Sequence, residues 1–190
     1  KISLIDGQTL SGIVKYEHGK TLKLQVTPAT NMVLALAQYN LQKGGYNPTD
    51  AVNLATSSIT DIFGVNIHTT RPLDVTNVLY SSSIPNDGLR YGMMLAALSS
   101  LTAEMAESQD IEPHSINAFT SIAMAQTMYA DILHDGVLNG IAAAEDGQEI
   151  KLGIGAVPLD ASVYRDKWAG HILSFANNEK NKSTLSAKDF

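Results

Sequence analysis

The residues whose types and spacing could do chemistry lie in one short segment, residues 130–140, where acidic and amide side chains surround two glycines. Asp131 and Asp135 are four residues apart, so on a helix they share one face. Together with Asn139 they offer oxygen atoms, which are the ligands that calcium prefers. We therefore take Asp131, Asp135 and Asn139 as candidate calcium ligands.

The same segment has a simpler structural interpretation. Acidic groups near a helix end, followed by a glycine, are common at helix termini. The calcium loop of EF-hands also needs oxygen ligands at alternate positions, and Leu133 stands where one is required. Calcium is thus a hypothesis for this segment, and we expect no other cofactor.

The remaining polar residues do not form a recognised catalytic pattern. The five histidines lack the paired helical spacing of zinc proteases, and His171 falls on an apolar helical stripe, where a packed, hydrogen-bonded histidine is usual. The chain has no cysteine, which excludes thiolate zinc sites, thiol catalysis and internal disulfides. The nucleophile-elbow pattern of serine hydrolases is missing as well.

Two carboxylate pairs suit glycoside hydrolysis by residue type. They are Glu104 with Glu107, and Asp110 with Glu112. Each pair has a solvated helix end as its alternative interpretation. We therefore predict no enzyme activity and name no catalytic residue.

The first 27 residues have the alternation of short β-strands. Residues 8–16 and 21–26 flank a turn at Gly19, as in a hairpin. Two or three strands are marginally stable alone. We therefore interpret residues 1–27 as a β segment, either the end of a sandwich that begins upstream or a ribbon packed on the following residues.

Residues 28–190 have mainly helical periodicity. The spacing of apolar residues predicts about five helices in a bundle, and a small β-hairpin insertion near 141–155. The expected fold class is therefore mainly α, with a β segment in front. The expected helices cover roughly 28–43, 48–63, 86–107, 115–134 and 160–176.

Composition limits the classes of function. The chain has 190 residues, a net charge of -6 and 17% charged residues, below the roughly 25% of typical soluble domains. A nucleic-acid groove needs clustered Lys and Arg, and a membrane span needs about 20 consecutive apolar residues. Neither pattern occurs here, so we expect no nucleic-acid partner and no membrane span.

Five short segments of the chain form a series in a fixed order. They are Val26–Thr30 before a helix, Ile59–Val65, Ala130–Gly140, Leu173–Asn181 and Leu185–Asp189. Taken in this order, they resemble a helical domain of large bacterial exported proteins. These are surface lipoproteins and adhesin-like proteins, in which the domain follows an immunoglobulin-like or carboxypeptidase-regulatory-like β module. The chain departs from this group at Asn31, where a second threonine is frequent.

The resemblance implies export to the cell surface and a structural or binding role, and it carries no catalytic residue. The chain begins at Lys1, and we expect a mature form or a fragment. The first expectation is a non-catalytic extracellular module for adhesion or assembly. It would contact neighbouring domains or identical subunits, and its unpaired N-terminal strands could join a homo-oligomer. The alternatives are a periplasmic or extracellular protein that binds a small ligand or calcium, and an enzyme that acts on a polysaccharide.

Overall fold

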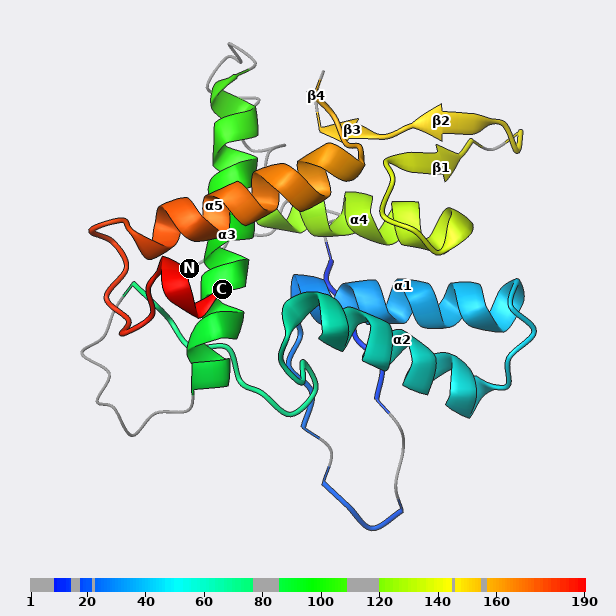
Figure 1. Cartoon of the computed structure of the whole chain (residues 1–190). Helices are drawn as coiled ribbons and strands as arrows, with labels where there is room; N and C mark the ends of the chain where they lie inside the picture. Colours follow the sequence, from blue (N-terminus) through cyan, green and yellow to red (C-terminus); the bar gives the residue numbers. More distant parts are fainter. Residues whose placement is uncertain are drawn as a thin grey trace.

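The computed structural model describes residues 9–14, 18–21, 23–76, 86–108, 120–144, 146–154 and 157–190. These residues form a mainly helical molecule with two small antiparallel hairpins (Figure 1). The prediction of a mainly α fold with about five helices is confirmed. The described α-helices are α1 (Pro28–Gln42), α2 (Pro48–Phe63), α3 (Asn86–Glu107), α4 (Ser121–Asp135) and α5 (Trp168–Ala176).

A capping box begins α1. The hydroxyl of Thr27 accepts a hydrogen bond from the N–H of Thr30, and the Thr30 hydroxyl accepts one from the N–H of Thr27. Pro28 occupies the first helical position, where its missing N–H leaves no donor unpaired. The Thr-Pro-x-Thr motif therefore has a local physical role as a helix start.

Glycines end two of the helices. Gly64 follows α2 with φ +62°, and Gly136 follows α4 with φ +82°. Both angles lie in the left-handed region, which glycine adopts without a Cβ penalty. Helix α4 therefore stops at Asp135, and the chain turns back along it.

The helices pack around one main core. In Figure 1, α1 and α2 form an antiparallel pair, α4 lies on the other side of α1, and α5 crosses α3. A π-helical turn at Val163–Lys167 leads directly into α5. This arrangement brings α3 and α5 together at one side of the molecule and α1, α2 and α4 at the other.

The strands lie in the C-terminal part of the chain. Strand β1 (Ile141–Ala143) pairs antiparallel with β2 (Glu149–Lys151), which confirms the hairpin predicted near 141–155. A second small pair, β3 (Gly153–Ile154) with β4 (Val157–Pro158), was not predicted. Figure 1 shows both hairpins beside α4.

The predicted N-terminal hairpin is wrong for the residues that the structure describes. Segments 9–14, 18–21 and 23–26 contain a turn at Gly19 but no strand. The described part instead bonds to helices: Ser11 N–H donates to Asn31 Oδ1 at 3.1 Å, and Gln126 donates to the Thr9 carbonyl oxygen at 3.3 Å. Ile13 also packs on the core. The alternation of apolar residues did not correspond to one buried face, since Val26 is 52% exposed. Residues 1–8 lie outside the described residues.

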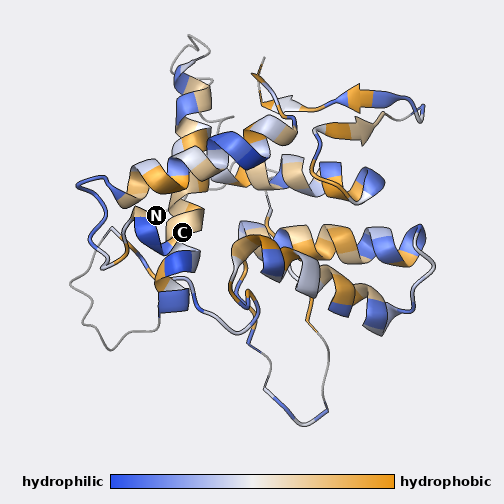
Figure 2. Ribbon diagram, viewed as in Figure 1, coloured by the Kyte–Doolittle hydropathy of each residue, from blue (hydrophilic) through white to orange (hydrophobic). Residues whose placement is uncertain are grey.

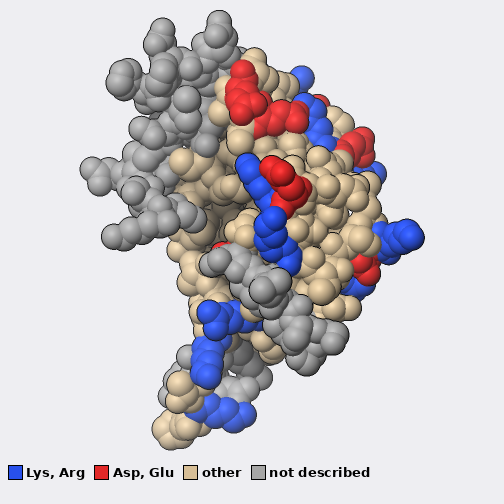
Figure 3. Space-filling view, turned by 90° about the vertical axis from the view of Figure 1, so that its left-hand side faces the viewer, with Lys and Arg blue, Asp and Glu red and all other residues tan. Residues whose placement is uncertain are grey.

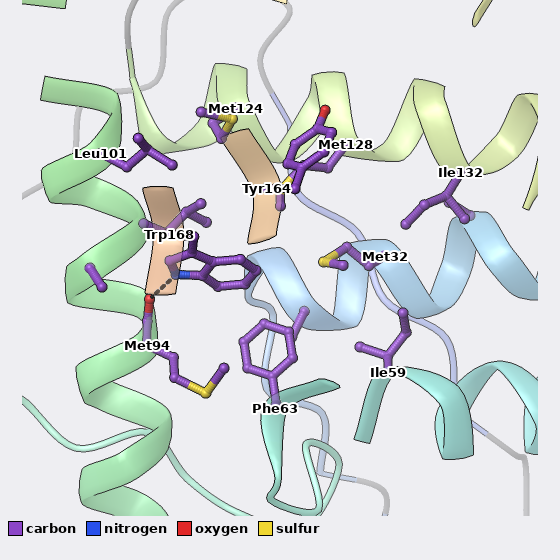
Figure 4. Packing of buried hydrophobic residues seen from close by; sticks show 14 of the residues in the cluster. Met32, Ile59, Phe63, Met94, Leu101, Met124, Met128, Ile132, Tyr164 and Trp168 are labelled. Atoms are coloured by element: carbon purple, nitrogen blue, oxygen red, sulfur yellow. Dashed lines mark hydrogen bonds between the residues drawn. The ribbon is translucent and has the colours of Figure 1, made fainter. Parts of the chain in front are cut away.

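Phe63 and Trp168 lie close together at the centre of the core (Figure 4). The ring of Phe63 packs edge-on against Tyr91 and Trp168, with centroid separations of 5.6 and 5.4 Å. The indole N–H of Trp168 donates to the carbonyl oxygen of Met94 at 3.0 Å. These contacts join α2, α3 and α5. All six methionines are buried.

Candidate functional site

The predicted calcium ligand Asp131 is completely buried on α4. Its Oδ2 accepts a hydrogen bond from the N–H of Gly140 at 2.9 Å, and its Oδ1 accepts one from the N–H of Ile141 at 3.1 Å. Burial raises the pKa of Asp131, while these backbone N–H groups oppose the rise. The carboxylate therefore fastens the loop after α4 to the helix.

The other two candidates lie beside it. Asp135 accepts hydrogen bonds from the Val137 N–H at 2.9 Å and from the Asn139 amide at 2.7 Å. The side-chain oxygen of Asn139 accepts one from the Ile141 N–H at 3.0 Å. The structure thus brings all three predicted residues together, with N–H donors directed at their oxygens.

This arrangement accounts for the segment as a folded loop. A cation here would have to replace N–H groups that already point at the same oxygen atoms. In the described part of the chain, no group of three His, Asp or Glu side chains is arranged to hold a metal ion. Calcium binding by these residues stays a hypothesis from the sequence, and the hydrogen bonds of the loop favour the structural role instead.

Tyr164 brings a buried hydroxyl group to this region. The hydroxyl interacts with the carboxylate of Asp131, but no acceptor among the described residues stands at normal hydrogen-bond geometry. Burial, and next the negative charge of Asp131, raise the pKa of Tyr164. The sequence placed Tyr164 on an apolar stripe with Trp168, and nothing in that pattern indicates its nearness to a buried carboxylate.

A second polar cluster joins α3 to α5. His171 Nε2 lies 3.0 Å from Glu104 Oε2, and His171 Nδ1 lies 3.1 Å from the hydroxyl of Ser100. The prediction of a hydrogen-bonded histidine on this stripe is confirmed. Sequence reasoning missed Ser100, although it stands four residues before Glu104 on the same helix.

A serine, a histidine and a carboxylate in a row are also the parts of an activated nucleophile. Acyl transfer needs, in addition, free donors for the developing oxyanion. Ser100 lies inside α3, where backbone N–H groups bond to carbonyl oxygens four residues earlier. The cluster is therefore best suited to holding α5 on α3. Of the predicted carboxylate pairs, Glu104 pairs with His171, and Asp110 and Glu112 lie outside the described residues.

The third feature is an apolar hollow between α1, α2 and the loop after α4, with a volume of ≈ 440 Å³. Its buried floor includes Ile59 and Ile132. Large apolar side chains around it are unusually exposed: Leu54 is 42% exposed, Ile62 49% and Val137 54%. Helices α1 and α2 both contribute lining residues to this hollow. Figure 2 shows that both helices contain many apolar residues. The described residues that line it, none of them charged, are Leu36, Asn40, Tyr46, Leu54, Ser58, Ile59, Ile62, Ile132, Gly136, Val137 and Leu138.

The apolar hollow was not predicted from the sequence. The apolar spacing within α2 predicts one stripe that includes Ile59, Ile62 and Phe63. In the structure Ile59 and Phe63 are buried, while Ile62 is turned outward with Leu54. The sequence alone does not show whether residues at the edge of an apolar helical stripe contact another part of the protein or are exposed to solvent.

Comparison with known proteins finds no relative: no family model matches the sequence, and neither a curated protein nor a solved structure is similar to it. The resemblance to exported surface proteins therefore stays a prediction. In the described part of the chain, no helix is both long and apolar enough to cross a membrane.

Proposed function

We propose that this chain is a non-catalytic interaction module of a bacterial surface protein. It acts in adhesion or assembly by contacting a neighbouring domain or an identical subunit through the apolar hollow. The observation that carries the proposal is the group of exposed large apolar side chains, including Leu54, Ile62 and Val137, around a hollow without charged lining residues.

The chemistry of this surface suits a protein contact. Burying apolar surface contributes about 25 cal/mol per Å². The centres of protein interfaces are depleted in charged residues and enriched in aromatic ones. Tyr46 lies at the hollow and is 46% exposed, so its ring can be covered while its hydroxyl keeps a polar contact. A partner that fills the hollow would gain free energy without desolvating a charge.

Export and surface location rest on the motif resemblance. The described N-terminal segments contain no strand, so assembly by strand addition has no support from them. The proposed contact therefore uses helices α1 and α2 and the loop after α4.

The test is the assembly state of the intact protein in its source cells. Leu54→Asp with Val137→Asp places two charges in the hollow, and we expect the double variant to run at a lower native mass than wild type. Ile150→Asp is the matched control, because Ile150 is 43% exposed on β2 and does not line the hollow. Equal native masses for all three proteins would reject an identical subunit as the partner, and crosslinking from the hollow then tests a neighbouring domain of the same protein.

A small ligand is the alternative occupant of the hollow. Its volume lies within the ~300–1,000 Å³ of typical ligand pockets, and Asn40 and Ser58 supply polar groups in an apolar lining. A bound ligand would raise the melting temperature of wild type and leave that of the Leu54→Asp, Val137→Asp variant unchanged. A small-molecule screen by thermal shift tests this alternative.

A further inference from the structure

A second hollow lies where α2, α3 and α5 meet. It shares only one lining residue, Ile62, with the apolar hollow described above. Its volume is ≈ 450 Å³. Phe63, Met94, Ile172 and Leu173 give it an apolar interior, and Leu173 is 44% exposed. On the side of the molecule where α3 and α5 lie, acidic and basic side chains are interspersed instead of forming a patch of one sign (Figure 3).

One lining residue, Arg90, has a hydrogen-bond donor without a partner in the part of the chain that the structure describes. The Nε atom of Arg90 is buried and has no hydrogen-bond partner. Among the described residues, no carboxylate forms an ion pair with this guanidinium. Arginine is always charged and carries five N–H donors, so a buried donor without an acceptor costs free energy. Arg90 is therefore prepared to receive an oxygen acceptor from outside the chain.

One acidic side chain of the hollow, Asp189, already interacts with Arg90 through its charge. Asp189 lines the hollow, and Arg90 is among the causes that lower the pKa of Asp189. Its Oδ2, however, accepts hydrogen bonds from the N–H of Ser186 at 2.7 Å and from the Ser186 hydroxyl at 3.1 Å. Asp189 thus belongs to the capping box of the last helical turn, Ala187–Asp189, and makes no hydrogen bond to Arg90 Nε.

Asp61 supplies a charge of the opposite sign. It lies on α2 at the same hollow and is exposed to solvent. In the described part of the chain it forms neither a hydrogen bond nor an ion pair. The hollow therefore offers a guanidinium with one unused N–H donor, the exposed carboxylate of Asp61 and an apolar interior.

We propose that this hollow binds a small zwitterion with an apolar side chain, namely an apolar amino acid or a dipeptide with free ends. The ligand carboxylate pairs with Arg90, the ligand ammonium pairs with Asp61, and the apolar side chain packs on Ile172 and Leu173. Arginine suits the carboxylate because its planar guanidinium can donate two parallel hydrogen bonds. The volume exceeds the lower limit of typical small-ligand pockets, about 300 Å³.

The test is a titration of the full chain followed by nuclear magnetic resonance. The probes are leucine, leucyl-leucine, N-acetyl-leucine and leucinamide. We expect saturable shifts with leucine, leucyl-leucine or both, which separates the two sources of the zwitterion. The two capped forms should bind at least ~10-fold more weakly, since each loses one charge contact. Equal affinity for capped and free forms, or no saturable shift at ~10 mM of either zwitterion, would overturn the proposal.

Variants assign the two charges. Asp61→Asn should bind leucine and N-acetyl-leucine equally well, because the contact to the ammonium group is lost. Arg90→Gln should bind leucine and leucinamide equally well, because the contact to the carboxylate group is lost. Arg71→Gln, an exposed arginine that does not line the hollow, should leave both preferences for leucine over the capped forms intact. Asp61 is exposed, so its variant should fold even if Arg90→Gln does not. If Asp61→Asn keeps its preference for a free ammonium, the proposal fails. None of these changes touches Leu54 or Val137, so the assembly contact is tested independently.

Discussion

The backbone N–H of Gly140 donates a 2.9 Å hydrogen bond to Oδ2 of the buried Asp131, nine residues earlier in the chain. Gly140 has φ +82°, and a Cβ atom at this position would lie 1.2 Å from the carbonyl oxygen of Leu159. Gly140 is therefore enclosed between α4 and the segment at Leu159 that precedes α5. This contact fixes the loop that forms one wall of the apolar hollow.

Replacing Gly140 by alanine should severely destabilise the protein, by at least ~3 kcal/mol. Both the left-handed backbone and the close approach of Leu159 oppose a side chain there. Gly147→Ala is the matched control, because Gly147 also has φ +82° but nothing lies within 4 Å of its added Cβ. The control should lose only about 1–2 kcal/mol. Urea unfolding of both variants measures the difference, and equal losses would contradict this account.

Asp131→Asn should cost about 1–3 kcal/mol, because its amide nitrogen would face an N–H donor at one of the two oxygen positions. The variant should also change the dependence of stability on pH. The pKa of Asp131 in the folded protein is raised from its ordinary value of 3.8, chiefly by burial. The folded state therefore keeps a proton that the unfolded state releases. This contribution to stability is complete below pH 3.8 and is lost as pH rises through the folded pKa.

Unfolding free energies from about pH 3 to about pH 7 test the sign of this effect. The advantage of wild type over Asp131→Asn should be largest at the acidic end and should shrink toward neutrality. An advantage that grows with pH would show that the N–H groups outweigh burial and that the folded pKa is lowered.

Calcium should leave the melting temperature of wild type unchanged at millimolar concentration. A ligand that binds only the folded state raises this temperature. The oxygens of Asp131, Asp135 and Asn139 already accept hydrogen bonds within the loop, which accounts for them without a cation. A rise that saturates with calcium and disappears in Asp135→Asn would instead establish the calcium site. Magnesium at the same concentration controls for ionic strength.

Trp168→Phe should destabilise the core by about 1–2 kcal/mol, and Trp168→Ala by about 3–5 kcal/mol. The first change removes the hydrogen bond to the Met94 carbonyl oxygen but keeps a ring against Phe63. The second also leaves a cavity between α2, α3 and α5. Circular dichroism is the suitable probe, because Trp168 is the only tryptophan and fluorescence would be lost. Similar losses for the two variants would contradict the packing role of the ring.

The helices could be predicted because their signals are local. Pro28 and Pro48 begin α1 and α2, Gly64 and Gly136 end α2 and α4, and the apolar spacing between such residues is helical. The grouping of Asp131, Asp135 and Asn139 was also predictable, since all three belong to one helix end. Their hydrogen-bond donors were not, because a donor's position depends on the path of the loop.

The N-terminal segment shows the opposite case. Alternation of apolar and polar residues at 21–26 is compatible with a β-strand and with an extended chain that packs on helices. Only hydrogen-bond pairing with a second strand distinguishes the two. The pairing of Ser100 with His171 and the unused N–H donor of Arg90 were equally beyond prediction. They depend on how α2, α3 and α5 meet, and residues far apart in the sequence determine that geometry.

The most direct test of the proposed function is a photo-crosslinking residue at position 54 of the intact protein in its source cells. Position 150 serves as the equally exposed control. We predict an adduct from position 54 only, which mass spectrometry identifies as a second copy of this chain or a neighbouring domain of the same surface protein. An absence of adducts from position 54, or equal adducts from positions 54 and 150, would contradict the assignment of the apolar hollow as a contact surface.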